Sequence, residues 1–196
     1  MSEKNEISTI GQSIREGVAD SLQGINGIEA EIVNLVKDTV SNSLRATGSL
    51  AEETIKVVKD VFKGAINATE EVGTGLTLST KYVAKGIILG VDEVGGDIIL
   101  AAGHTARSAV KEAAGVGADI ALIARRAAEG IIEATREVGG NVEDAAKVTV
   151  GGAIEAAGTI SKTAAKAVEE LLVGVVKGLK EIATSALPGS GVHKDQ

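Results

Sequence analysis

The sequence predicts an all-α fold built from eight tandem 22-residue amphipathic repeats, each consisting of two eleven-residue halves. Residues 94–115 and 116–137 are two copies of one unit, and the same frame covers residues 6–181 without insertion or deletion. Apolar residues recur at spacings of three and four, as they do on one face of a helix. This phase continues unchanged through the glycine-rich boundaries between units.

Two columns of the repeat define a predicted apolar contact face. The seventeenth position is aliphatic in every unit, and the first position is aliphatic in every unit after the first. The residues expected to make these contacts are Leu22, Leu44, Ile66, Ile88, Val110, Ile132, Ile154 and Val176, together with Val72, Val94, Val116 and Val138. On a helix they belong to an apolar sector of somewhat under half the circumference, which is wider than a coiled-coil seam.

The polar side of each helix is uneven. The tenth position is mostly basic and gives a predicted basic border: Lys37, Lys59, Lys81, Arg125 and Lys147. Acidic residues lie toward the opposite border. Parallel neighbouring helices would therefore match a basic edge with an acidic edge, whereas antiparallel neighbours would match like charges. The alternative is that these charges only keep an outer face hydrated, because exposed ion pairs contribute little.

Small residues occupy a further column. The fifteenth position holds Gly64, Gly86, Ser108, Gly130, Gly152 and Gly174 in the last six units. Alanine and glycine also fill much of the apolar sector in units five to seven. Small side chains there would allow close approach of helix backbones, or shallow insertion into an interface.

The first segments are predicted as follows. Residues 1–5 form a flexible lead-in. The apolar spacing from Ile7 to Ala46 predicts an amphipathic helix, which Gly24 and Gly27 weaken locally. A capping box, a hydroxyl residue followed by a carboxylate three residues later, predicts that a helix starts at Leu50.

Later unit boundaries place glycine beside a good N-cap residue, at Asp97, Asp119 and Asn141. Each boundary is a predicted kink or turn. Because 22 residues make six helical turns, a long glycine-kinked helix explains the constant phase most simply. Helical hairpins folded back into a solenoid or bundle are the second explanation. The predicted repeat body ends at residue 181, and residues 182–196, which contain Pro188, are predicted to be a flexible tail.

Composition narrows the class of protein. The net charge of −7 and the low aromatic content, one Phe and one Tyr, argue against a nucleic-acid partner. The chain has no cysteine, and its first residues lack the pattern of a signal peptide. No uncharged apolar run approaches the length of a transmembrane span. These features predict a soluble cytoplasmic protein.

The sequence shows no catalytic constellation. It has no phosphate-binding loop, no dinucleotide fingerprint, no zinc-protease motif and no nucleophile elbow. His104 aligns with Tyr82 and Arg126 in the neighbouring units, which indicates a solvated polar position rather than a ligand or base. We therefore expect a protein that is not an enzyme and that uses neither a cofactor nor a metal.

Aromatic-poor repeats of eleven and 22 residues resemble those of the synucleins, the exchangeable apolipoproteins and the group 3 late-embryogenesis-abundant proteins. The most specific points are charged-Gly-aliphatic elements around Gly17, Gly64, Gly86 and Gly130, which are similar to an element of synuclein repeats. The resemblance covers residues 6–181 and implies a helix that coats lipid or another hydrophobic surface. The chain lacks the punctuating prolines of apolipoproteins, is poorer in lysine than synucleins and is less hydrophilic than dehydration proteins.

Two functions follow from these observations. The first is a non-enzymatic structural protein whose amphipathic helices coat a membrane, granule or lipid droplet, with a stress-protective role and a location at the periphery of that surface. The alternative is a self-associating helical scaffold, a bundle or filament, whose apolar faces pack together. The predicted partners are accordingly a lipid surface or further copies of the chain.

Overall fold

The computed structural model describes residues 8–23, 27–46, 50–72 and 75–185, and this part of the chain is entirely helical apart from the connections. The helices are α1 (Thr9–Gln23), α2 (Ile28–Arg45), α3 (Leu50–Val72), α4 (Leu76–Glu93), α5 (Ile98–Gly115), α6 (Ile120–Glu137), α7 (Val142–Ile160) and α8 (Lys162–Ser185). The predicted all-α repeat fold is confirmed. Helix α8 runs past the predicted end of the repeat body at residue 181, whereas the predicted lead-in and residues 186–196 lie outside the described residues.

The glycine-rich boundaries are turns, so the prediction of a continuous kinked helix is wrong and the hairpin alternative is correct. Gly95, Gly117 and Gly139 adopt left-handed backbone conformations, with φ of 70°, 70° and 73°. After each of these glycines, the next residue donates its backbone N–H to a carbonyl five positions back, which closes the preceding helix. A left-handed residue cannot continue a right-handed helix, and the chain reverses there.

The predicted N-caps of the last repeats are also confirmed. The carboxylate of Asp97 accepts hydrogen bonds from the backbone N–H groups of Ile99 and Leu100, each at 2.9 Å. Asp119 and Asn141 cap α6 and α7 in the same way. Each cap satisfies backbone donors that the first helical turn leaves unpaired. Each of these three turns therefore ends one helix and begins the next.

The boundaries at Gly27 and Gly75 also separate two helices, but they lack a capping side chain. Gly27 and Gly75 have φ of 85° and 96°, and each precedes a helix without a side-chain cap. The predicted helix over Ile7–Ala46 is therefore split in two at Gly27. The predicted capping hydroxyl before Leu50, Ser49, lies outside the described residues.

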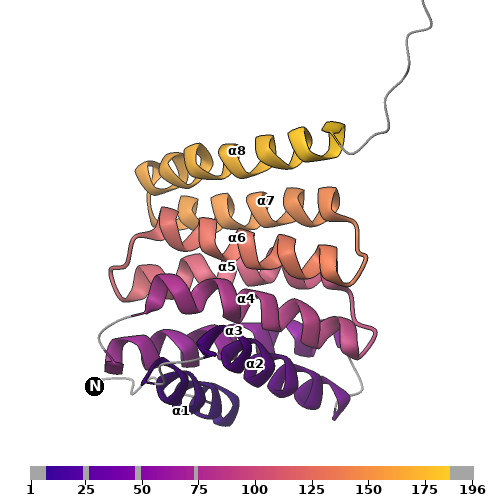
Figure 1. Ribbon diagram of the computed structural model, residues 1–196. Coiled ribbons are helices and arrows are strands. Elements are labelled where there is room, and N and C mark those ends of the chain that lie inside the picture. Colours follow the sequence, from indigo (N-terminus) through magenta and orange to yellow (C-terminus); the bar gives the residue numbers. More distant parts are fainter. Residues whose placement is uncertain (1–7, 24–26, 47–49, 73–74, 186–196) are drawn as a thin grey trace, which may run out of the picture.

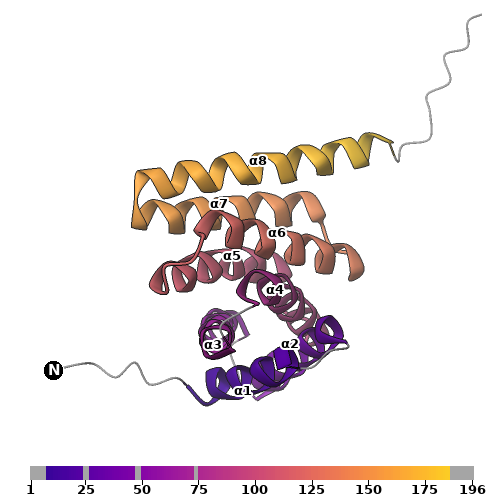
Figure 2. The ribbon, with the colours of Figure 1, turned by 60° about the vertical axis from the view of Figure 1, so that its left-hand side comes forward.

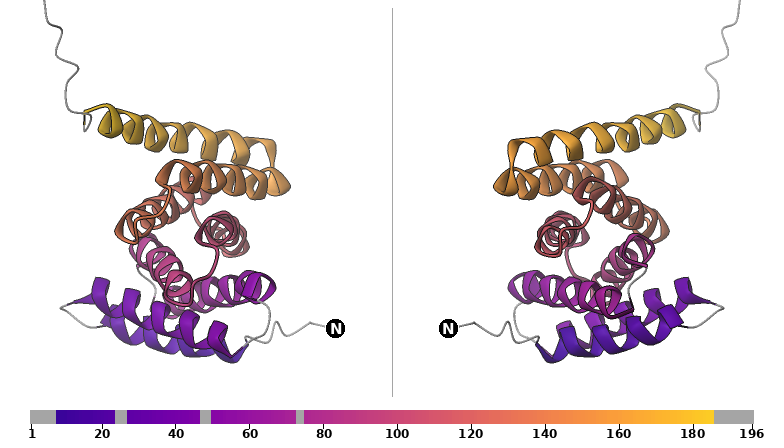
Figure 3. Two further views of the ribbon diagram at one scale, coloured as in Figure 1. Left: turned by 90° about the vertical axis from the view of Figure 1, so that its right-hand side faces the viewer. Right: turned by 90° about the vertical axis from the view of Figure 1, so that its left-hand side faces the viewer.

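The helices stack in chain order from α1 and α2 at one end to α8 at the other (Figure 1). Each of the helices α1 to α7 packs most extensively on a helix two places away, whereas α8 packs slightly more on α7 than on α6. Helices α1, α3, α5 and α7 form one layer, and α2, α4, α6 and α8 form the other. Because consecutive helices reverse direction, neighbours within a layer run in the same sense, although α3 and α5 cross at a wide angle (Figure 2, Figure 3). Helical hairpins stacked this way bury the apolar sector of each helix between the two layers.

The core changes in character along the stack. In α2, α3 and α4 it consists mainly of buried valine, isoleucine and leucine side chains, with Phe62 as its largest fully buried residue. In α5, α6 and α7 it consists mainly of alanine. Smaller side chains bring the backbones closer, which explains the alanine-rich units that the sequence shows.

The fifteenth column of the repeat marks where a helix meets its neighbour within the layer. At Gly64, Gly86, Gly130 and Gly152, an added Cβ would overlap backbone atoms of the helix two places earlier. In the first two units, which have no such earlier helix, this column holds Asp20 and Asn42, and both are exposed. The glycines therefore serve packing between units 44 residues apart, since only a residue without a Cβ fits there.

Candidate binding groove between helices α3 and α5

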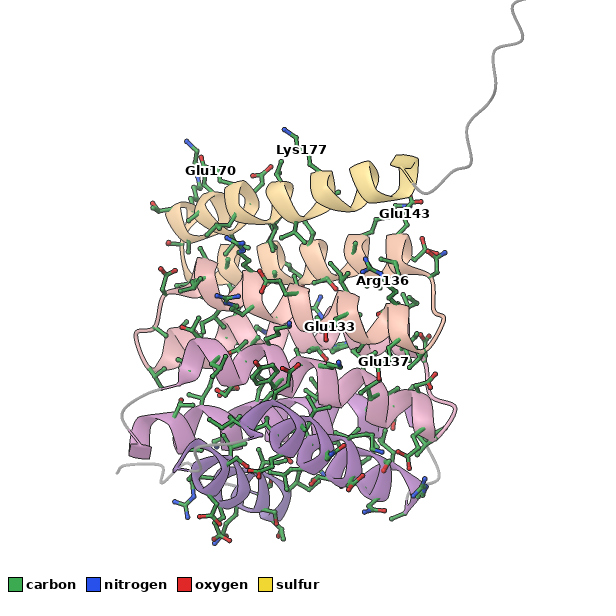
Figure 4. The ribbon with its side chains drawn as sticks, viewed as in Figure 1. Glu133, Arg136, Glu137, Glu143, Glu170 and Lys177 are labelled. Carbon is green, nitrogen blue, oxygen red and sulfur yellow. The ribbon has the colours of Figure 1, made fainter. Side chains whose placement is uncertain are left out.

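Ion pairs join three of the helix pairs within a layer, namely α2–α4, α4–α6 and α5–α7. Between α4 and α6, the carboxylate of Glu133 accepts from Lys81 at 2.8 Å and from Lys85 at 2.7 Å, while Glu137 lies 3.0 Å from Lys85. Figure 4 shows Glu133 and Glu137 on α6, beside α4. Each lysine pairs with acidic residues about two units further along the chain, as expected of parallel neighbours.

These contacts shift the acid–base properties of the groups involved. Hydrogen bonds from Lys81 and Lys85 lower the pKa of Glu133, in spite of its partial burial. The same contacts raise the pKa of Lys81 and of Lys85. Lys85 is the most enclosed of the three, with 15% of its side chain exposed, so solvent screens its pairs less than it screens most surface ion pairs.

Other helix pairs repeat the arrangement with different residues. Glu93 on α4 pairs with Lys37 at 3.3 Å and Arg45 at 2.6 Å on α2. Glu155 on α7 pairs with Arg107 on α5. A carboxylate of the later helix thus lies against cations of the earlier helix in the pairs α2–α4, α4–α6 and α5–α7.

The structure places the predicted apolar contact face largely inside the protein. Leu44, Ile66, Ile88, Val110 and Ile132 are buried. The residues placed at half-buried positions are Ile154, Val176, Val94, Val116 and Val138, the last three of them at the turns. The side chains of Leu22 and Val72 lie outside the described ones.

The predicted basic border is divided among several environments. Lys37 and Lys81 link helices within a layer, as described above. Arg125 pairs with Glu129, and Lys147 with Glu143, inside their own helices. Lys59 is exposed and lines a groove on the surface of the protein, between α3 and α5. The border residues are therefore not brought together into one site.

The α3–α5 pair differs from the equivalent α4–α6 pair at two positions. The fifteenth column of α5 holds Ser108 instead of glycine, and the position that corresponds to Glu133 holds Lys111. A side chain at the first position prevents close backbone approach, and a lysine at the second cannot pair with the lysines of α3. In Figure 2 α3 is seen almost end on while α5 runs across the view. In Figure 3 α5 is seen almost end on while α3 runs across the view. The two helices consequently cross at a wide angle and contact each other less than other pairs in their layer.

This separation leaves a groove of about 670 Å³ between α3 and α5. Its lining residues come from both helices: Glu52, Ile55, Lys56, Lys59, His104, Arg107, Ser108, Lys111 and Glu112. Four of these side chains are cationic and two are carboxylates, on a chain whose net charge is −7. Ile55, with 40% of its surface exposed, adds an apolar contact point.

The charges of the groove are unevenly paired. Lys56 lies 3.7 Å from Glu53, and Arg107 pairs with Glu155 outside the groove. Among the described residues, Lys59 and Lys111 have no partner within ion-pair distance. The groove therefore offers two lysines, one on each wall, that form no ion pair among the described residues, although Glu112 acts on both and Glu155 on Lys111 at longer range.

Two titratable groups of the groove are affected by burial. Burial raises the pKa of Glu112, although Lys59, Lys63 and Lys111 act in the opposite direction. Burial and the nearby Arg107 guanidinium lower the pKa of His104, which favours the neutral ring. The sequence predicts a solvated position for His104, whereas the structure places it at a half-buried one. Neither group has the arrangement of a nucleophile with an activating base.

A second opening lies between α6 and α8. Its volume is about 650 Å³, and it is lined by Arg125, Ala167, Glu170, Leu171, Gly174 and Val175. An added Cβ at Gly174 would meet no atom within 4 Å, unlike at the glycines of this column in the closed pairs. The connection before α8 also differs, because α7 and α8 are joined through Ser161 alone, without the left-handed glycine of the earlier turns.

The described residues hold no cluster of three or more His, Asp or Glu side chains that could bind a metal ion. No helix in the described ranges is both long enough and apolar enough to cross a membrane. The reasoning from sequence missed the groove, although part of its signal was present: Ser108 is the one residue other than glycine in the fifteenth column of units three to eight.

Comparison with known proteins supports the fold alone. No family model matches the chain, and no curated protein does. Among solved structures, the chain is similar to a de novo designed helical repeat protein, DHR7, with a TM-score of 0.50 and 19% sequence identity. The match covers 90% of this chain and 94% of the designed protein. The chain thus has the architecture of a helical repeat protein over nearly its full length.

Proposed function

We propose that this protein is a non-enzymatic helical-repeat scaffold that binds a partner protein in the groove between α3 and α5. What supports the proposal is the groove itself, where an exposed isoleucine lies beside two lysines that have no ion-pair partner among the described residues. Helical repeat proteins bind through extended surfaces, and a local departure from the repeat is the natural place for specificity.

The coating of a lipid surface is the competing function. In the structure, the predicted apolar face packs between the two layers, so those side chains become available to lipid only if the helices separate. The resemblance to synucleins, apolipoproteins and late-embryogenesis-abundant proteins stays a prediction, as does the cytoplasmic location. Self-association of the chain likewise stays a prediction, because the helix packing described here lies within one molecule.

Circular dichroism with liposome co-sedimentation separates the two functions. A scaffold of this fold is expected to be helical in dilute buffer, to melt cooperatively, and to stay in the supernatant when anionic or neutral liposomes are sedimented. A chain that is disordered in buffer and gains helix only on liposomes would contradict the scaffold proposal and support coating. Cooperative melting matters because partially ordered helices would not melt with one transition.

A further inference from the structure

The groove between α3 and α5 has the geometry of an ion clamp that lacks its carboxylate. Shifting the register by 22 residues superimposes Lys59 and Lys63 on Lys81 and Lys85, the two lysines that hold Glu133. The same shift superimposes Lys111 on Glu133 itself. Helix α3 therefore carries the two lysines of the α4 clamp, whereas α5 has a lysine at the position where α6 has its carboxylate.

The packing at the same place leaves the groove open. Ser108 occupies the position at which Gly130 brings the backbone of α6 against Lys81 of α4. Because a Cβ at that position would overlap the facing backbone in a closed pair, α5 keeps a distance from α3. Space and unpaired positive charge thus occur together, and both result from departures within α5.

We propose that the α3–α5 groove binds an acidic amphipathic helix of a partner protein, with a glutamate or aspartate of that helix held between Lys59 and Lys111. Its apolar face would cover Ile55, in the manner of a helix that lays its apolar side into a groove. This proposal rests on the scaffold function and names the chemistry of its partner. The charge of the groove selects an acidic helix over a basic one.

The carboxylates already in the groove do not replace the partner. Glu112 lies near Lys59, Lys63 and Lys111 without forming an ion pair among the described residues, and its burial disfavours its charged form. Glu52 lies a helical turn or more from Lys59 along α3. An incoming carboxylate would therefore meet more positive than negative charge.

Fluorescence anisotropy with two synthetic peptides tests the proposal on the full chain. Both peptides have one helix length, with leucine and alanine on one face. One carries glutamate along the border of that face, and the other carries glutamine at the same positions. The glutamate peptide is expected to bind at least about tenfold more tightly, and its advantage is expected to shrink as the salt concentration rises. Equal affinity for the two peptides, or no binding of either, would overturn the proposal.

Charge-reversal variants locate the binding. Lys59→Glu and Lys111→Glu each replace a lysine of the groove by a carboxylate, which repels the glutamates of the peptide. Each substitution is expected to lower the affinity for the glutamate peptide about tenfold. Lys147→Glu is the matched control, because Lys147 is exposed, occupies the same repeat position as Lys59 and lies outside the groove. This variant has the same change in net charge and is expected to bind the peptide as the wild type does. Wild-type affinity in both groove variants, or an equal loss in the control, would contradict the assigned site.

Sedimentation of the protein without peptide tests whether a second copy of the chain occupies the groove. The chain is expected to have the same mass with and without the groove substitutions. A dimer that Lys59→Glu and Lys111→Glu both dissolve would assign the groove to a second copy and overturn the proposal. Circular dichroism of each variant shows whether the fold persists, so failure of the peptide test is distinguishable from failure of the scaffold itself.

Discussion

The α4–α6 pair and the α3–α5 pair occupy equivalent places in consecutive repeats, so each residue of one has a counterpart 22 positions away in the other. In α4–α6, Gly130 lets the backbones meet and Glu133 joins the lysines of the facing helix. In α3–α5, the counterparts are Ser108 and Lys111, and a groove takes the place of the contact. The closed pair and the open pair thus differ at two side chains on adjacent turns of one helix.

The two helix pairs differ both in backbone packing and in charge, and these two differences have unequal effects on stability. Backbone contact at a glycine is a short-range requirement, since a single methyl group is enough to prevent it. An ion pair between partly exposed groups contributes little by itself, and mainly specifies which edges of two helices lie together. We therefore expect substitutions of the packing residues to have larger effects on stability than substitutions of the charged residues.

The largest expected effect is that of Gly130→Ala. Its Cβ would overlap the Lys81 carbonyl group, and α6 must move away from α4, so we expect the free energy of unfolding to fall by about 2 kcal/mol. Gly174→Ala is the control in the same column, where the Cβ meets open space. Alanine is the better helix former, and this variant is expected to gain up to about 1 kcal/mol. Urea denaturation measures both, and equal effects would refute the assignment of the column to close packing.

The next effect is that of Glu133→Gln. We expect a loss of about 1 kcal/mol near neutral pH, because two hydrogen-bonded lysines lose their shared carboxylate. The lowered pKa of Glu133 means that its contribution is present above the ordinary carboxyl pKa of 4.5 and is lost as the pH falls through the lower folded-state value. Unfolding curves of wild type and variant should therefore converge on acidification. A difference between them that does not change with pH would exclude the ion pairs as its cause.

The smallest effect is that of Lys111→Glu, which restores the arrangement of α4–α6 in charge but not in packing. We expect a gain of about 0.5 kcal/mol, since the new carboxylate would line the same groove as Lys59 of the facing helix. Adding Ser108→Gly is expected to increase the gain beyond the sum of the two single changes, because closer approach strengthens the pairs. A double-mutant cycle measures this coupling. Additive effects would show that the two departures open the groove independently.

The sequence alone established more of the fold than of the site. The repeat length, the helical period and the aliphatic columns were visible in it, as were the caps at Asp97, Asp119 and Asn141, since all of these depend on neighbours within one or two turns. The column of small residues was visible as well. Its meaning was not, because a glycine that receives another helix is identical in sequence to one that merely weakens its own.

Only the tertiary structure decided how the units are arranged. A repeat of six whole helical turns keeps its apolar residues in phase whether the chain continues straight or reverses, so the pattern could not distinguish a kink from a turn. The reversal at Gly95, Gly117 and Gly139 is selected because it buries the apolar face of each helix against units 22 and 44 residues away. Contacts over that separation, including the one missing between Ser108 and α3, depend on the arrangement of the whole stack.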